Sequence, residues 1–174
     1  MTRKNILLAN LEVIRQQLES FGRAPTLLPA ALRQSPEKKA WLYKPSADRW
    51  SIHEIILHLA DSEVSVYIHS RHFGAKLESS VIKFDPARWA GSLSYSHRIS
   101  HGALGIIRCL RKATYQLLVS LPESVWKNSV EHPEDGRLSL TQWIEIQERH
   151  IPHHIDQMKQ NYDAWLKMYP RTSF

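Results

Sequence analysis

The sequence has only one cysteine, Cys109, among its 174 residues. A disulfide within the chain is therefore excluded, and so is a zinc-finger site, which needs at least two cysteine ligands. A single cysteine is also typical of a reducing compartment, so we expect a cytoplasmic protein. Because Cys109 lies in the apolar run 103–118, we predict that its side chain is a small member of the core.

Long hydrophobic runs are also lacking. The N-terminal run 6–9 is followed at once by Glu12 and Arg15, which makes it too short for a signal peptide. No run reaches the length of a membrane span, so we expect no membrane partner. Hydrophobic residues make up 43% and charged residues 23% of the chain, an ordinary globular balance. The length predicts a single domain covering residues 1–174.

The net charge of +6 raises the question of nucleic-acid binding. The 23 lysines and arginines are scattered as singles and pairs, with carboxylates between many of them. A basic run interleaved with aromatic residues, the usual sign of a nucleic-acid surface, is missing. We therefore expect no nucleic-acid partner.

Four segments show the apolar periodicity of amphipathic helices, about 3–21, 51–75, 94–121 and 139–169. The second and fourth begin with capping boxes, Ser51-x-x-Glu54 and Ser139-x-x-Gln142. This pattern predicts an all-α fold, a four-helix bundle.

The connecting segments carry proline, glycine and turn signals. We expect the first connection to be mostly loop, with one helical turn near 30–34, and we expect 79–93 to be a structured loop. A short β-hairpin is predicted before the last helix, with its turn at 132–136.

Histidines in the second and fourth helices carry the functional signal. His150 and His154 are four residues apart, which places both imidazoles on one face of a helix. His58 falls on the apolar stripe of the second helix and can supply a third imidazole. Three neutral imidazoles with an open fourth position are the ligand set of a catalytic metal ion. The residues leave a second interpretation open, a non-catalytic bundle in which these histidines are buried polar groups or a vestigial site.

Two further polar residues lie one helical turn from a proposed ligand. Asp61 follows His58 and could accept the second N–H of an imidazole. Gln157 follows His154 and could bind a group beside the ligands or the substrate. His153 is rotated by about 100° from its neighbour, so we place it at the rim. Pro152 lies between the two ligands of the last helix, where we expect a bend that keeps both ligands in place.

The same residues resemble the DinB/YfiT-like family of metalloenzymes. Residues 50–63, beginning Trp-Ser-x-x-Glu and containing His58, are similar to the family's second-helix signature, and His150-x-x-x-His154-x-x-Gln157 is similar to its closing motif. The segments 82–85 and 132–136 resemble the YfiT branch in particular. The likeness covers roughly residues 41–158, most of the chain.

This resemblance implies a four-helix bundle, often a homodimer, with zinc or nickel bound by His58, His150 and His154. It implies either a metal-dependent hydrolase or a transferase that moves a low-molecular-weight thiol, such as bacillithiol or mycothiol, onto an electrophilic small molecule. Arg71 or Arg149 is a candidate for attracting a carboxylated thiol.

Overall fold

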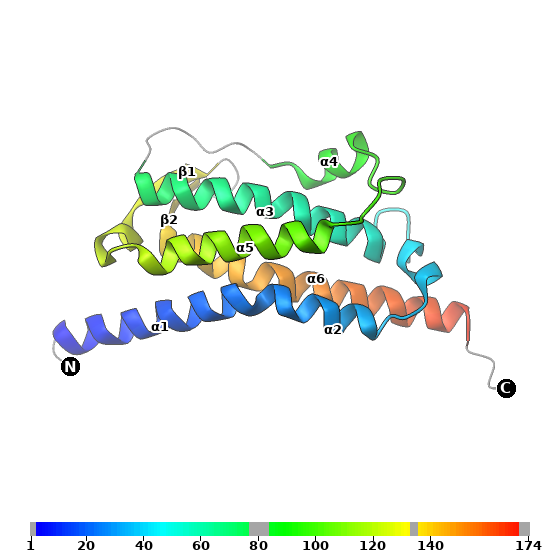
Figure 1. Cartoon of the computed structure of the whole chain (residues 1–174), viewed down its shortest axis with the longest axis horizontal. Coiled ribbons are helices and arrows are strands. Elements are labelled where there is room, and N and C mark those ends of the chain that lie inside the picture. Colours follow the sequence, from blue (N-terminus) through cyan, green and yellow to red (C-terminus); the bar gives the residue numbers. More distant parts are fainter. Residues whose placement is uncertain (1–2, 77–83, 133–135, 171–174) are drawn as a thin grey trace.

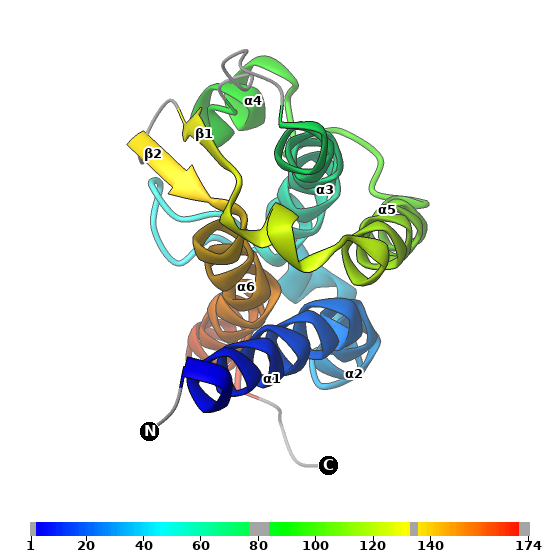
Figure 2. The same ribbon diagram turned by 90° about the vertical axis from the view of Figure 1, so that its left-hand side faces the viewer.

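Four long helices form the body of the protein. The computed structural model describes residues 3–76, 84–132 and 136–170. Its long helices are α1 (Arg3–Arg23), α3 (Ile52–Ala75), α5 (Ala103–Ser120) and α6 (Leu140–Met168). Seen from the end, they surround a common interior, with α1 crossing below α6 (Figure 2). The predicted all-α four-helix bundle is confirmed.

The two helices that carry the histidines begin where the capping boxes predict. The Ser51 side chain accepts from the Glu54 backbone, and the Glu54 carboxylate accepts from the backbone of Ser51. Ser139 and Gln142 make the same reciprocal pair at the start of α6. Each box satisfies two backbone donors that a helix end would leave unpaired, which fixes the start of the helix.

The connecting segments contain more helix than predicted. Helix α2 (Leu27–Arg33) occupies the first connection, with 3₁₀ turns Ala24–Thr26 and Lys38–Leu42 on either side. Helix α4 (Pro86–Ser92) lies where we expected only loop, although residues 79–83 of that segment lie outside the described residues. Pro86 occupies the first helical turn of α4, where a missing N–H costs nothing.

Helix α5 begins at Ala103, nine residues later than predicted. Ser94 and Gly102 have positive φ angles of 52° and 87°, and a helix cannot run through either position. The chain between them folds into turns at one end of α3 (Figure 1).

The predicted hairpin before the last helix is confirmed. Strands β1 (Ser129–His132) and β2 (Gly136–Ser139) pair antiparallel, with Ser129 opposite Ser139. The predicted turn residues 133–135 lie outside the described residues.

The apolar core is divided into two clusters along the bundle. One cluster contains Ile55 and Leu59 of α3 together with Ile151 and Ile155 of α6. The other contains residues further along α3 and earlier in α6, among them Phe73 and Trp143. Between the two clusters the interior is polar, because the buried residues Ser62 and Glu63 of α3 and Arg111 of α5 lie there.

The prediction that Cys109 belongs to the core is wrong. Its side chain is exposed on α5, whose buried face is formed by Ile107, Arg111, Thr114 and Leu118. An apolar run does not fix which face of a helix is buried. Because Arg111 is buried on α5, Cys109 faces outward.

Within the described residues, no helix is long and apolar enough to cross a membrane.

Candidate metal centre

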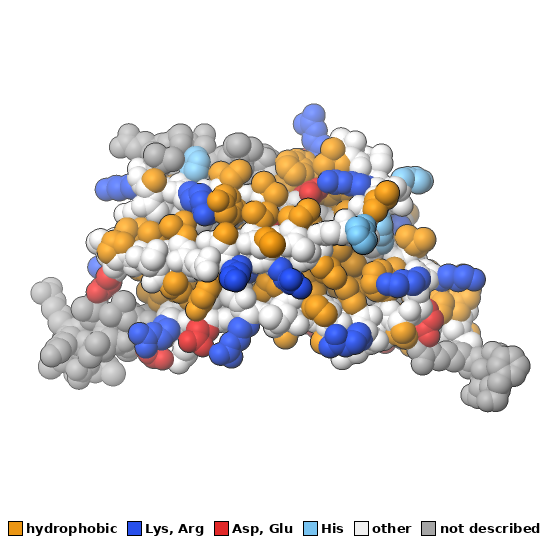
Figure 3. All heavy atoms as spheres, in the orientation of Figure 1, with side chains coloured by type: hydrophobic (Ala, Val, Ile, Leu, Met, Phe, Trp, Pro, Cys, Tyr) orange, Lys and Arg blue, Asp and Glu red, His pale blue; other side chains and the backbone are white. Residues whose placement is uncertain are grey.

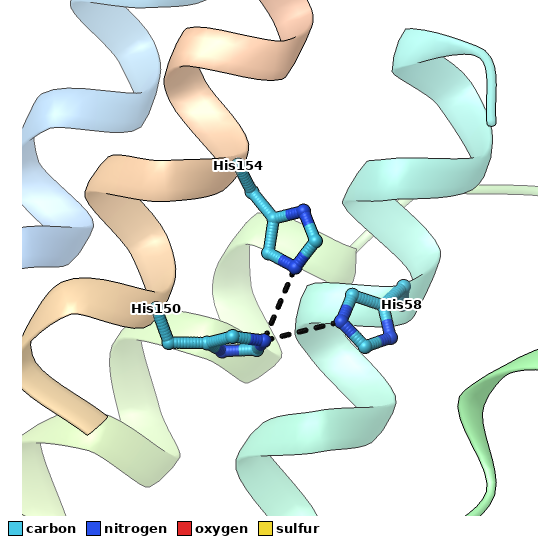
Figure 4. A group of neighbouring side chains, drawn as sticks. All are labelled: His58, His150 and His154. Carbon is cyan, nitrogen blue, oxygen red and sulfur yellow. Dashed lines mark hydrogen bonds between the residues drawn. The ribbon is translucent and has the colours of Figure 1, made fainter. Parts of the chain in front are cut away.

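Three histidine side chains from α3 and α6 converge on one point (Figure 4). The Nε2 atom of His150 lies 3.2 Å from Nε2 of His58 and 3.1 Å from Nε2 of His154. His58 and His154 are only 3% and 6% exposed. The structure thus brings together the three residues that the sequence singled out. Helix α6 is continuous through Pro152 and keeps both of its imidazoles on one face, while the bend at Pro152 stays a prediction.

All three imidazoles are held in the neutral form. Burial, followed by the neighbouring imidazoles, lowers the pKa of His58 to about 3 and that of His150 well below its usual value. Burial also lowers the pKa of His154, to about 4, against the opposing effect of its hydrogen bond to Gln157. Neutral imidazoles are the form that binds a metal ion.

Gln157 selects the tautomer of His154. Its Oε1 atom lies 2.8 Å from Nδ1 of His154, and its Nε2 atom lies 2.9 Å from Nε2 of His153. Because Oε1 can only accept, Nδ1 of His154 carries the proton, and the lone pair of its Nε2 faces the other two histidines. The sequence-based expectation for Gln157, a partner of a group beside the ligands or of the substrate, stays a prediction. In the structure its amide contacts the His154 imidazole, and His153 is exposed.

Spacing and hydrogen bonding of the cluster fit a bound cation. Bonds of about 2.0–2.1 Å from a metal ion to each nitrogen in a tetrahedron place neighbouring nitrogens about 3.3 Å apart. The Nδ1 atoms of His58 and His150 are buried without a hydrogen-bond partner. With one proton per neutral ring, no choice of tautomers satisfies every buried nitrogen of this cluster, whereas a central cation would use the lone pairs of all three Nε2 atoms.

Aromatic rings shield one side of the cluster. The Trp50 ring lies 4.6 Å from the His58 ring and 6.3 Å from the His154 ring, measured between centroids. Phe84 stacks on His58 at 5.9 Å, and Trp89 packs edge-on against Phe84 at 4.9 Å. Residue spacing could not predict the approach of Phe84 to His58, because that contact depends on the path of the chain after α3.

Asp61 does not have the role that we predicted. Its carboxylate accepts from the hydroxyl of Tyr95 at 2.7 Å and from the guanidinium of Arg98 at 3.0 Å. The imidazole N–H site that it was expected to occupy, Nδ1 of His58, has no partner. Three residues along a helix rotate a side chain by about 60° from its starting face, and that is enough to turn Asp61 toward the segment before α5.

Neither predicted basic neighbour lies at the cluster. Arg71 is more than three helical turns beyond His58 on α3, where its guanidinium covers the Tyr67 ring and donates to the Tyr67 carbonyl. Arg149 is exposed on the outer face of α6 and pairs with Glu145 at 2.7 Å. A role for either residue in attracting a thiol has no support in the geometry.

The residue that sequence reasoning missed is Arg111. Its guanidinium is fully buried, makes two hydrogen bonds to the Glu63 carboxylate, and points toward the backbone carbonyls of Phe21 and Gln147 at 3.5 and 3.3 Å. One side chain of α5 thereby reaches α1, α3 and α6. The positive charge of Arg111 also contributes, after burial and the neighbouring imidazoles, to the lowered pKa of His150.

Comparison with known proteins places the chain in a family. The sequence profile of the DinB superfamily matches residues 20–158. The chain is 33% identical to a protein of Oceanobacillus iheyensis over 107 residues, and the alignment spans 61% of each chain. It is 22% identical to YfiT of Bacillus subtilis over 147 residues, which is 82% of this chain and 83% of YfiT. Both relatives are provisionally named metal-dependent hydrolases.

The fold agrees with this placement. The solved structure of YfiT, described as an unusual four-helix bundle, matches with a TM-score of 0.79 over 88% of each chain, at 18% sequence identity. A sequence profile that covers most of the chain, together with this fold, decides the family: the chain belongs to the DinB superfamily.

Proposed function

We propose that this protein is a metal-dependent enzyme whose divalent ion, zinc or nickel, is bound by His58, His150 and His154. The observation that carries the proposal is the convergence of three histidine side chains, each with a ring nitrogen within 4.8 Å of the other two. The provisional names of the relatives point the same way.

The chain's own residues prepare the centre for that role. Three neutral ligands leave the full positive charge of the ion uncompensated, and Gln157 holds His154 in the tautomer that a ligand needs. Trp50 and Phe84 keep one side of the centre apolar, which strengthens the attraction between the ion and an anion. When bound, such an ion lowers the pKa of water or of a thiol and so supplies a nucleophile at neutral pH.

Hydrolysis is the activity that the relatives' names favour, with water as the nucleophile. Transfer of a low-molecular-weight thiol to an electrophilic carbon is the second candidate. It is favoured by the uncharged ligand set, because an ion that keeps its full charge binds a thiolate well. Both reactions use the same three ligands, so only an assay separates them.

The experiment compares the two nucleophiles on metal-loaded protein. One series contains model carboxylic esters and amides in water. The other contains 1-chloro-2,4-dinitrobenzene with cysteine, glutathione, bacillithiol or mycothiol in turn. A rate that needs metal and no thiol supports hydrolysis, and a rate that needs metal and one of the thiols supports transfer. Both series use the Cys109→Ser variant in place of the parent protein, because the exposed Cys109 thiol can itself react with the electrophile.

The competing interpretation is a non-catalytic bundle with a structural or vestigial site. It predicts that metal-loaded and metal-free protein give the same background rate in both series. That result would contradict the proposed enzyme function even if the metal binds.

A further inference from the structure

A groove runs between α1 and α5, away from the histidine cluster. It consists of two adjoining hollows of about 580 and 400 Å³, and Glu19 and Tyr115 line both. The volumes fall in the range of small-molecule sites. None of the three clustered histidines lines either hollow. We name this feature the α1–α5 groove.

Gly22 allows the ring of Tyr115 to lie directly on α1. A Cβ atom at this position would stand 2.8 Å from Cδ2 of Tyr115, too close for the ring to keep its place. The absence of a side chain on Gly22 therefore sets the position of the Tyr115 ring, which forms the wall shared by the two hollows.

The larger hollow is cationic. Arg108 and Lys112 are four residues apart on α5, so they project from one face, and neither makes a hydrogen bond or ion pair with any described residue. Arg23, on the opposite side, has a long contact of 3.4 Å with Glu19, both largely exposed. Three cations and one carboxylate leave this end of the groove net positive.

The smaller hollow is lined mainly by apolar side chains, with Arg15 and Glu19 at its α1 side. Its lining includes Ile14 from α1, Leu118 and Val119 from α5, and Trp126 beyond α5. In Figure 3, basic side chains lie over the middle of the junction between α5 and α1, and hydrophobic side chains lie toward its left-hand part. Nine residues of helix separate Lys112 from Leu121, a distance of about 14 Å along the groove.

We propose that the α1–α5 groove binds a single-chain anionic amphiphile, of the class of fatty-acid carboxylates. Arg108 and Lys112 are placed to bind the carboxylate by charge-assisted hydrogen bonds, and the chain would extend past Tyr115 onto Leu118 and Trp126. Neither the charged head nor the apolar chain of the ligand would fill both hollows of the groove by itself. An inorganic anion would leave the apolar side chains of the smaller hollow uncovered, and an uncharged chain would leave Arg108 and Lys112 without a partner among the described residues.

The test is calorimetric titration of the full chain with dodecanoate, kept below its micelle concentration. We expect one molecule bound per chain and at least tenfold weaker binding in the double variant Arg108→Gln/Lys112→Gln. Val119→Glu should weaken binding as strongly, because it adds a second carboxylate to the smaller hollow beside Leu118, and the 51% exposure of Val119 makes the substitution tolerable for folding. Lys167→Gln, which removes an exposed charge at the far end of α6, is the matched control and should bind like the parent protein.

Three comparison ligands define what would overturn the proposal. Equal affinity for dodecyltrimethylammonium would show that the cations do not select the ligand. Inorganic phosphate binding as tightly as dodecanoate would reduce the groove to an anion site without a chain. Sedimentation with phosphatidylglycerol vesicles in the absence of dodecanoate binding would assign the basic surface to a membrane instead. An unchanged titration in both groove variants would also refute the proposal.

Discussion

The Nδ1–H of His154 donates to Oε1 of Gln157, with 2.8 Å between the two atoms. This one bond decides which nitrogen of the imidazole faces His58 and His150. It also ties the cluster to the surface, because the amide nitrogen of Gln157 lies 2.9 Å from the exposed His153. Partners of this kind orient a ligand and raise its basicity, so they affect metal affinity without touching the metal.

Replacing Gln157 by leucine should weaken metal binding by about 10- to 100-fold, because His154 would lose the group that fixes its tautomer. Competition with a chromophoric chelator measures the affinity. Asp156→Asn is the matched control, since Asp156 is exposed and, among the described residues, pairs with Lys159 alone at 3.2 Å. Equal affinities of the Gln157→Leu variant and the parent protein would show that the hydrogen bond does not orient the ligand.

Replacing Arg111 by methionine should lower the free energy of unfolding by about 3–5 kcal/mol, because the Glu63 carboxylate would remain buried without its partner. Urea denaturation measures the change. The double variant Glu63→Met/Arg111→Met should recover much of the loss, since it removes both buried charges. A single variant as stable as the parent protein would contradict the assignment of Arg111 as the link between the four helices.

Metal-free protein should lose stability as the pH falls from about 6.5 toward 4. The lowered pKa values, about 3 for His58 and about 4 for His154, mean that the unfolded chain binds protons in this range while the folded chain does not. The stability that these residues contribute is therefore complete above the unfolded pKa and is lost below it, by up to about 1.4 kcal/mol per pH unit for each histidine.

Thermal unfolding at a series of pH values measures this loss. His58→Gln is the comparison variant, because glutamine does not titrate in this range. Its stability should fall less steeply with acid than that of the parent protein. If the stability of the two proteins fell equally with pH, the pKa of His58 would not be lowered by burial, and this prediction would be wrong.

Features of the fold that depend on residues close together in the sequence could be predicted from the sequence. The capping boxes at Ser51 and Ser139 mark both helix starts because side chain and backbone satisfy each other within four residues. The spacing of His150 and His154 likewise placed two imidazoles on one face of α6. The pairing of His58 with them depended on the apolar stripe of α3, which the structure buries.

Features that depend on contacts between distant segments were not predictable in this way. Asp61 turns to Tyr95 and Arg98, which lie more than 30 residues later, and no spacing rule brings them together. Arg111 in an apolar helix gave no sign that Glu63 would pair with it in the interior. The burial of Arg111 in turn fixed the rotation of α5 and left Cys109 exposed, against expectation.

The most direct test of the central claim is the metal content of the purified protein, determined by elemental analysis. We predict close to one divalent ion per chain, a large loss in His154→Ala, and full retention in His101→Ala, which removes an exposed histidine outside the cluster. A folded protein that contains no metal and binds neither zinc nor nickel when either is supplied would contradict the account.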